Sequence, residues 1–249
     1  MSKTRIDRLL VERGLVASRE RAQAMILAGR VLVNEQKIEK SGTAVDSEAS
    51  IRLLGNEMRY VSRGGLKLER ALEHWKIDVT GATCMDVGTS TGGFTDCLLQ
   101  HGAALVVAVD TGYGQIDAKL RSDARVRLLE KTNARYLERE KVPEPVEVVV
   151  MDVSFISATL VLPAVVDAAW IGKQVSRKEL IVLVKPQFEV GRERVGKGGI
   201  VRDRDAQQAA VEKVKAAVEH LGAYGGEVIE SPILGTEGNR EFLLHAKFQ

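Results

Sequence analysis

A glycine-rich segment is the first sign of chemistry in this sequence. It reads Asp86-Val87-Gly88-Thr89-Ser90-Thr91-Gly92-Gly93-Phe94-Thr95 and lies between a predicted strand, Ala82 to Val87, and a predicted helix, Phe94 to Gln100. Glycine has no Cβ, so the backbone N–H groups of such a loop, and the N-terminus of the following helix, can approach a ligand closely. The segment therefore predicts a cofactor-binding loop.

Four charged residues placed near predicted strands could supply the reactive groups. Asp152 and Lys185 each end an apolar run, Lys67 precedes the first strand of the sheet, and Glu241 opens the last one. In an open parallel sheet, ligands bind beyond the carboxyl ends of the strands, so we expect these side chains to share one rim. Together they could align a weakly acidic hydroxyl group and help to remove its proton.

The positions of the apolar runs predict an α/β fold. Five short runs that read as strands alternate with helical segments such as Leu160 to Trp170 and Ala206 to Leu221. The runs are Cys84 to Val87, Ala104 to Asp110, Val126 to Leu129, Val146 to Asp152 and Leu180 to Lys185. Such a pattern predicts a doubly wound parallel sheet, and two further strands, at 228–230 and 241–245, predict an antiparallel edge.

Length and composition limit the remaining possibilities. The 249 residues are 45% apolar and 28% charged, which suits one sizeable α/β domain with a small appendage. No apolar run of about 18 residues occurs and the N-terminus is rich in arginine, so we expect neither a membrane span nor a signal peptide, and a cytoplasmic location by default. Two cysteines, Cys84 and Cys97, and four scattered histidines predict no metal site.

The first 58 residues predict a separate α+β domain. Residues 1–40 hold nine Lys or Arg against five Asp or Glu. Ser18 is a plausible N-cap for a second short helix, and Val31 to Val33 with Lys37 to Glu39 predict a hairpin around Asn34 to Gln36. We place a linker at residues 59–62 and the larger domain at 63–249.

This N-terminal segment resembles a small RNA-binding module found in a small-subunit ribosomal protein, many pseudouridine synthases and bacterial tyrosyl-tRNA synthetases. The resemblance lies in Arg5 to Leu15, Ser18 to Ala22 and Ala28 to Asn34. It implies an RNA-facing surface, for which arginine is well suited. An aid to folding or oligomerisation is the alternative use of such a module. The predicted RNA-binding residues are Arg5, Arg8, Arg19, Arg21, Arg30 and, in the larger domain, Arg63.

The glycine loop lacks the Gly-x-Gly-x-x-Gly fingerprint of dinucleotide-binding enzymes. It is similar instead to the S-adenosylmethionine loop of class I methyltransferases, although Thr91 stands where related ribose methyltransferases often have proline. Asp110, about 20 residues past the loop, is placed to take ribose hydroxyls of the cofactor. The predicted cofactor-binding residues are Asp86, Gly88, Gly92, Gly93, Phe94, Asp110, Asn133 and Asp152.

The order Lys67, Asp152, Lys185, Glu241 resembles the catalytic tetrad of RNA ribose 2′-O-methyltransferases. The resemblance implies that Lys185 is the base or the oxyanion stabiliser, that Asp152 orients Lys185, and that Glu241 orients a lysine or the ribose. Glu237 competes with Glu241 for the last role. We favour Glu241 because it begins an apolar strand, whereas Glu237 lies among glycines.

Taken end to end, the chain resembles the TlyA or haemolysin A-like family of rRNA 2′-O-methyltransferases. Segments that carry this resemblance include Ser62 to Leu68, Val109 to Gln115, Asp152 to Ser157 and Val184 to Glu189. The family implies methylation of ribose, at cytidine in some members, in ribosomal RNA or ribosomal subunits. It implies no metal or membrane partner and leaves the oligomeric state open.

Three other functions remain as alternatives. They are a non-catalytic RNA-binding or ribosome-assembly factor, a haemolysin, and a dehydrogenase, which the loop spacing disfavours. One further segment, Gly191 to Asp203, has no regular pattern and predicts a flexible loop. If that loop clamps RNA, Arg192, Arg194 and Lys197 would contact phosphates.

Overall fold

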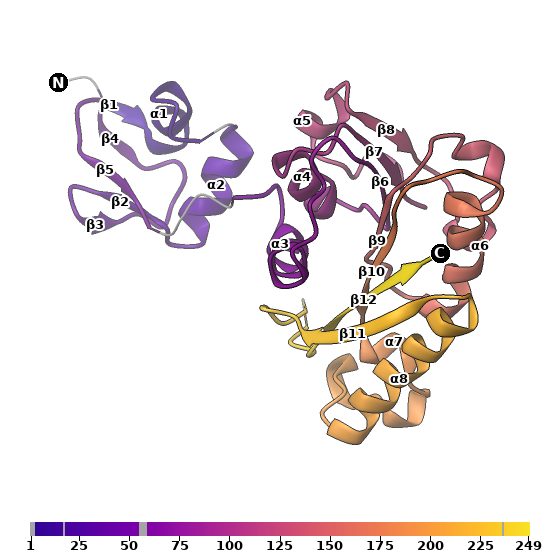
Figure 1. The fold of residues 1–249 in the computed structure, drawn as a ribbon. Helices are drawn as coiled ribbons and strands as arrows, with labels where there is room; N and C mark the ends of the chain where they lie inside the picture. Colours follow the sequence, from indigo (N-terminus) through magenta and orange to yellow (C-terminus); the bar gives the residue numbers. More distant parts are fainter. Residues whose placement is uncertain (1–2, 17, 55–58, 236) are drawn as a thin grey trace. The chain divides into compact units, whose positions relative to one another are not determined.

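The chain divides into two compact units, Met1–Arg59 and Tyr60–Gln249. The computed structural model describes residues 3–16, 18–54, 59–235 and 237–249 (Figure 1). The last residues of the predicted N-terminal domain, 55–58, lie outside the described part. Of the predicted linker, Tyr60 and Val61 pack within the apolar core of the C-terminal unit.

The N-terminal unit packs two short helices against small sheets. Its apolar core includes Ile6, Leu10, Ile26 and Val31, each fully buried. The side chain of Ser18 accepts a hydrogen bond from the backbone N–H of Arg21, which confirms the predicted N-cap. The elements are β1 (Lys3–Arg5), α1 (Ile6–Glu12), α2 (Arg19–Leu27), β2 (Val31–Val33), β3 (Gln36–Lys37), β4 (Ala44–Asp46) and β5 (Ile51–Leu53).

The predicted hairpin forms, but its turn is one residue shorter than expected. Val33 pairs with Gln36, so the loop holds only Asn34 and Glu35. Both have positive φ values, 49° and 63°. Two such residues fit the type I′ turn, whose twist matches that of the paired strands. Gln36, expected in the turn, therefore belongs to strand β3.

The C-terminal unit is built on a seven-stranded sheet in the order β11-β12-β10-β9-β6-β7-β8. The pairs from β10 to β8 are parallel, and β12 is antiparallel to both of its neighbours. This arrangement confirms the predicted sheet with its antiparallel edge. The strands are β6 (Thr83–Val87), β7 (Leu105–Val109), β8 (Val126–Leu129), β9 (Val148–Met151), β10 (Lys178–Val184), β11 (Tyr224–Glu230) and β12 (Phe242–Phe248).

Helices cover both faces of this sheet. Neighbouring residues of β6 show the two faces: Cys84 packs in the cluster that contains Leu68 of α3, and Met85 packs in the cluster that contains Val214 of α8. The sheet is therefore doubly wound, as the continuous apolar strands predict. The helices are α3 (Gly64–Trp75), α4 (Gly93–Gln100), α5 (Ala118–Arg121), α6 (Ala158–Trp170), α7 (Pro186–Glu189) and α8 (Arg204–His220). Single 3₁₀ turns occur at Ala134–Tyr136, Arg139–Lys141, Arg192–Arg194 and Lys197–Gly199.

The strand order reverses at β6. From this strand the chain adds β7 and β8 on one side, and then returns to add β9 and β10 on the other. The glycine loop follows β6 directly, so it lies at the point where open α/β sheets bind their ligands. The carboxyl ends of β7, β9 and β10 share that edge.

Both cysteines are buried and unbridged. Burial raises the pKa of the Cys84 thiol to about 12. A thiol with so high a pKa is a poor nucleophile and metal ligand, so Cys84 serves as a small residue of the core.

Candidate active site

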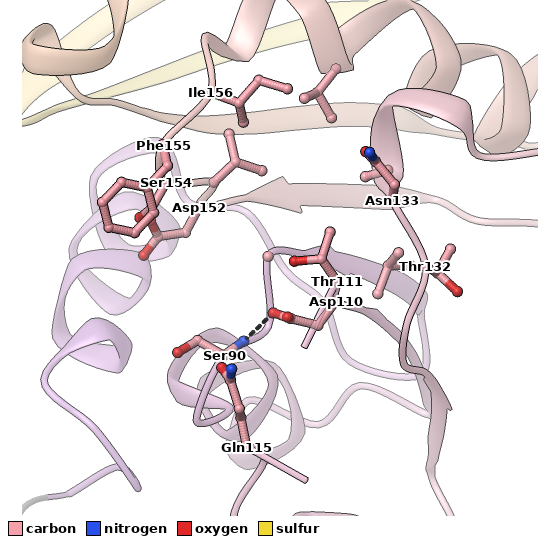
Figure 2. Close-up of a pocket in the computed structure, with 15 residues that line it drawn as sticks. Ser90, Asp110, Thr111, Gln115, Thr132, Asn133, Asp152, Ser154, Phe155 and Ile156 are labelled. Carbon is pink, nitrogen blue, oxygen red and sulfur yellow. Dashed lines mark hydrogen bonds between the residues drawn. The ribbon is translucent and has the colours of Figure 1, made fainter. Parts of the chain in front are cut away.

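A cavity of about 320 Å³ opens at the carboxyl edge of the sheet, beside the glycine loop. Figure 2 shows its lining side chains, which come from the segments after β6, β7, β8 and β9. Of the eight predicted cofactor-binding residues, four line it: Gly88, Asp110, Asn133 and Asp152. The sequence therefore predicted the position of the cavity, and half of the predicted cofactor-binding residues line it.

The glycine loop lies close to the segment after β9. Gly88 has a φ of +87°, and a Cβ there would lie 2.4 Å from the backbone oxygen of Asp152. Any larger residue would push the two segments apart, so this position needs glycine for close backbone approach and not only for its dihedral angles.

Asp110 fixes the far side of the loop. One carboxylate oxygen accepts from the backbone N–H of Ser90 at 2.7 Å (Figure 2). The other accepts from the backbone N–H of Gly112 at 2.6 Å. A carboxylate oxygen can accept more than one hydrogen bond, so both oxygens keep capacity for hydroxyl donors of a ligand. Asn133 instead uses its side-chain oxygen to cap the 3₁₀ turn after β8, accepting from the N–H of Arg135.

The other four predicted cofactor residues do not line the cavity. Asp86 is fully buried and accepts a hydrogen bond from the hydroxyl of Thr95 at 2.6 Å. Phe94 packs in the core with α3 and α4. A Cβ on Gly92 would meet the side chain of Leu120, and one on Gly93 would meet Ser62. These four residues therefore support the conformation and packing of the loop and do not line the cavity.

Burial raises the pKa of Asp86 to about 7, and the Thr95 hydroxyl opposes part of this effect. The nearby carboxylates of Asp152 and Asp110 raise the pKa further. One oxygen of Asp86 accepts a hydrogen bond from Thr95, whereas the other, also buried, has no partner among the described residues. A neutral carboxyl group suits such a site, because an unpaired buried charge is costly.

Lys185 follows β10 directly and contacts two residues from the segment after β9. Its ammonium nitrogen lies 2.5 Å from a carboxylate oxygen of Asp152 and donates to the hydroxyl of Ser154 at 2.7 Å. The parallel pairing of β9 with β10 places both segments at the same edge. Asp152 and Ser154 also line the cavity, so this lysine lies next to the predicted cofactor site.

Lys67 and Glu241 form a second ion pair, which is deeply buried. Their side chains are 10% and 3% exposed, and the ammonium nitrogen lies 2.5 Å from the carboxylate. Lys67 comes from the first turn of α3, and Glu241 lies directly before β12. A buried lysine and glutamate satisfy each other here, because either charge alone would be costly to bury.

Strand register relates the two pairs. In the antiparallel ladder of β10 and β12, Val184 pairs with Phe242. The next residues outward are Lys185 and Glu241, so they leave neighbouring strands at the same edge. The four predicted catalytic residues thus form two ion pairs, and one member of each pair, Lys185 or Glu241, adjoins one of two neighbouring strands.

The choice between the two candidate glutamates has a geometric basis. Glu241 is buried against Lys67, whereas Glu237 is exposed. The carboxylate of Glu237 lies near Gly199, in the segment that follows α7. The geometry therefore favours Glu241 as the partner of the first lysine.

Several lining residues were not predicted. Ser154 and Phe155 come from the segment after Asp152, and Ser90 and Gln115 come from the loops after β6 and β7. Phe155 is 93% exposed, has a φ of +63°, and its ring lies 5.4 Å from that of Phe188. Such a conformation is rare for a bulky residue and marks the segment as constrained. Ser154 and Phe155 could have been predicted from the sequence, because they follow Asp152 by only two and three positions.

The arginines predicted to bind RNA are exposed in the N-terminal unit. Arg5 and Arg19 both donate to the carboxylate of Asp7, which is fully buried. These contacts, led by that of Arg5, hold the pKa of Asp7 well below its usual range. Arg8 pairs with Glu12 at 3.6 Å. Asp7 therefore orients two of the predicted RNA-binding side chains.

The remaining predicted RNA-binding residue, Arg63, directly precedes α3 and donates to the backbone oxygen of Leu234 at 3.2 Å. Within the described ranges, no group of three or more His, Cys, Asp or Glu side chains is arranged to hold a metal ion. Nor does any helix in that part of the chain have the length and apolar character needed to cross a membrane.

Comparisons with known proteins support both units. Residues 60–248 match the FtsJ-like methyltransferase family, and residues 4–51 match the S4 domain. The chain is 45% identical over 249 residues to the 16S/23S rRNA (cytidine-2'-O)-methyltransferase TlyA of Mycobacterium tuberculosis, covering 99% of this chain and 91% of that protein. It is 39% identical to Hemolysin A of Brachyspira hyodysenteriae, covering 97% of this chain and 98% of that protein.

A solved structure agrees with these matches. It is described as a putative hemolysin from Streptococcus thermophilus and superposes with a TM-score of 0.75 at 42% identity, covering 100% of this chain and 90% of that one. A putative S-adenosylmethionine dependent methyltransferase from Listeria monocytogenes also superposes, with a TM-score of 0.54 at 17% identity, covering 76% of this chain and 100% of that one. With the family match, this likeness confirms the predicted class I methyltransferase fold. Since these matches extend over nearly the whole chain, the protein belongs to the FtsJ-like methyltransferase family, together with TlyA and Hemolysin A.

Proposed function

We propose that this protein transfers a methyl group from S-adenosylmethionine to a ribose 2′-hydroxyl of ribosomal RNA, at a cytidine. The observation that carries the proposal is the contact of Lys185 with Asp152 and Ser154 at the edge of the cavity. The relatives named as rRNA cytidine-2'-O-methyltransferases support the same substrate class.

The side chains that line the cavity suit the chemistry of the cofactor. Asp110 offers carboxylate lone pairs for ribose hydroxyls, and Gly88 lets the loop approach the backbone of Asp152 closely. Asp152 and Asn133 add polar groups to walls that also contain Val153 and Ile156. When bound, S-adenosylmethionine supplies a methyl group already activated by its positive sulfur. The protein must therefore align the acceptor oxygen and help to remove its proton.

Lys185 is the residue placed to assist that deprotonation. An ammonium group has three N–H donors. One is donated to Ser154, and Asp152 balances the positive charge as an ion pair, which leaves a donor for the 2′-oxygen. Negative charge that develops on this oxygen is stabilised by the ammonium group. The proton passes to the neighbouring carboxylate of Asp152, because an ammonium nitrogen has no lone pair to accept it.

Lys67 and Glu241 position the acceptor side of the site. Glu241 holds the Lys67 ammonium at a fixed place, and strand register sets this pair beside Lys185. In this role Lys67 limits how the ribose can lie, while Glu241 acts through Lys67 as a positioning residue. The fixed geometry reduces the entropy that alignment of the two reactants would otherwise cost.

The N-terminal unit contributes affinity for RNA. In this proposal residues 1–58 are the RNA-binding module, 59–62 the linker and 63–249 the methyltransferase domain of a cytoplasmic protein. Exposed arginines suit phosphate and 2′-hydroxyl contacts, and the match of residues 4–51 to the S4 domain supports this assignment.

The test is methyl transfer from labelled S-adenosylmethionine to ribosomal RNA and to ribosomal subunits. Wild-type protein should label a ribose 2′-oxygen, and Lys185→Ala should lose about 100-fold or more in turnover while retaining its cofactor affinity. Lys178→Ala, an exchange at the start of the same strand, serves as the control. Cofactor binding without transfer to any rRNA substrate would favour the non-catalytic RNA-binding factor instead.

A further inference from the structure

A second cavity, of about 400 Å³, lies in the C-terminal unit at the start of α8. Three arginines line it, Arg202, Arg204 and Arg240, together with Gln207. No acidic side chain is among the described residues of its lining. This cavity is separate from the one at the glycine loop, with which it shares no lining residue.

Buried side chains hold the walls of this cavity in place. Asn239, 1% exposed, accepts from the backbone N–H of Val201 at 2.9 Å and donates to the backbone oxygen of Gly199 at 2.8 Å. Gln207 is also buried and donates to the backbone oxygen of Val201 at 2.7 Å. The segment expected to be a flexible loop is therefore anchored at this end.

The arginines keep most of their donors available. Within the described ranges Arg202 and Arg204 form no ion pair, and Arg240 reaches Glu230 only at 3.5 Å, between two half-exposed side chains. The nearby acid Asp203 instead accepts from the backbone N–H of Asp205, as the N-cap of α8. Three guanidinium groups around one cavity provide the planar N–H donors that recognise phosphate oxygens.

We infer that the Arg202–Arg204–Arg240 cavity binds a phosphate group of the RNA backbone. This inference rests on the proposed function, because it makes the cavity part of the RNA path. Arg240 directly precedes Glu241, whose carboxylate holds Lys67. A phosphate bound here would therefore contact a residue next in sequence to the positioning residue Glu241. Such a contact sets the position of the RNA strand but does not depend on its base sequence.

This assignment differs from the sequence-based expectation for the same segment. Arg192, Arg194 and Lys197 were the predicted phosphate contacts, but none of them lines the cavity. Arg192 and Arg194 lie in a 3₁₀ turn nearer to α7. The cavity depends on pairing the end of that segment with Asn239 and Arg240, which are far away in sequence.

The test compares two double variants of the full chain. Arg202→Gln/Arg204→Gln removes two cavity charges, whereas the control Lys141→Gln/Lys247→Gln removes two exposed charges of the same unit outside the cavity. Binding of an rRNA fragment is measured over a series of salt concentrations, with thermal unfolding as a check of folding. The cavity variant should weaken binding about 10-fold. Its plot of log affinity against log salt should be less steep by about one, the effect of losing one phosphate contact.

Inorganic phosphate distinguishes the source of the anion. We expect phosphate to bind weakly to the wild type, as seen by ³¹P line broadening, and to lose this binding in the cavity variant. Loss of phosphate binding with unchanged RNA affinity and salt slope would overturn the RNA assignment, as would an equal loss of RNA affinity in the control variant. RNA binding is scored without methyl transfer, so failure of the proposed activity would leave this result readable.

Discussion

The ammonium nitrogen of Lys185 lies 2.5 Å from a carboxylate oxygen of Asp152, although the two residues follow different strands. The pairing of β9 with β10 is what brings them together, since parallel neighbours end at the same edge. Ser154 accepts from the same nitrogen at 2.7 Å. The contact between Lys185 and Asp152 is thus set by the sheet.

Removal of the Ser154 hydroxyl should impair the chemical step more than substrate binding. Ser154→Ala deletes one acceptor that holds the Lys185 ammonium group, so we expect kcat to fall about 10-fold with little change in KM for RNA. Steady-state kinetics at saturating cofactor measure both constants. Ser154→Thr keeps a hydroxyl and should restore most of the rate. An unchanged kcat in the alanine variant would mean that Ser154 does not position Lys185.

Asp110→Asn should weaken the affinity for S-adenosylmethionine about 10- to 100-fold, because an amide replaces a carboxylate that accepts from Ser90 and Gly112. Calorimetry measures the dissociation constant. Asp78→Asn is a matched control, since Asp78 also accepts from a backbone N–H two residues further on, at Thr80. Equal affinities of the Asp110 variant and the wild type would remove Asp110 from the cofactor site.

Glu241→Gln should cost both stability and activity. It leaves the buried ammonium group of Lys67 without its charged partner, a loss of about 3–5 kcal/mol in the free energy of unfolding. In the double variant Lys67→Met/Glu241→Leu no charge is left unpaired, so much of the stability should return while methyl transfer stays low. Urea unfolding and turnover are measured on all three proteins. Recovery of activity together with stability in the double variant would show that the pair serves only the fold.

Titration of Asp86 should make the free energy of unfolding depend on pH. Burial raises the pKa of this carboxyl group in the folded state to about 7, above its ordinary value of 3.8, so the folded state binds the proton more tightly than the unfolded one. The contribution is fully present below about pH 4 and is lost as the pH rises through 7. The total change is about 4 kcal/mol at most.

The measurement is the difference in unfolding free energy between wild type and Asp86→Asn, which removes the titrating group. The unfolding free energy of the wild type should fall relative to that of Asp86→Asn as the pH rises from about 4 to about 7. Above that pH the difference should stay constant. Two stability curves that stay parallel over this range would contradict the raised pKa of Asp86.

Local patterns in the sequence were sufficient to predict the sheet and the position of the cavity. The strand at Val126 to Leu129 has the predicted ends. The run of Val148 to Met151 is fully buried, as expected of a continuous apolar run in a doubly covered sheet. The glycine loop follows the strand where the order reverses. The comparisons confirm the predicted family.

The partners of the charged residues were predicted only in part. The family resemblance implied that Asp152 orients Lys185, as the ion pair shows, but it left Glu241 between a lysine and the ribose. That Lys67 is the partner of Glu241 depends on strand order and register, which no single segment encodes. Asp86 was expected to face the cofactor, as acids at strand ends often do. Instead the hydroxyl of Thr95, on the following helix, provides an internal partner for this side chain.

The central claim is ribose methylation of rRNA assisted by Lys185. Mapping of 2′-O-methyl groups in both large rRNAs tests it most directly, in cells that lack the gene and carry either the wild-type chain or Lys185→Ala. We predict at least one ribose methylation, at a cytidine, that disappears with the gene, returns with the wild type and stays absent with Lys185→Ala. Identical methylation maps with and without the gene would contradict the account.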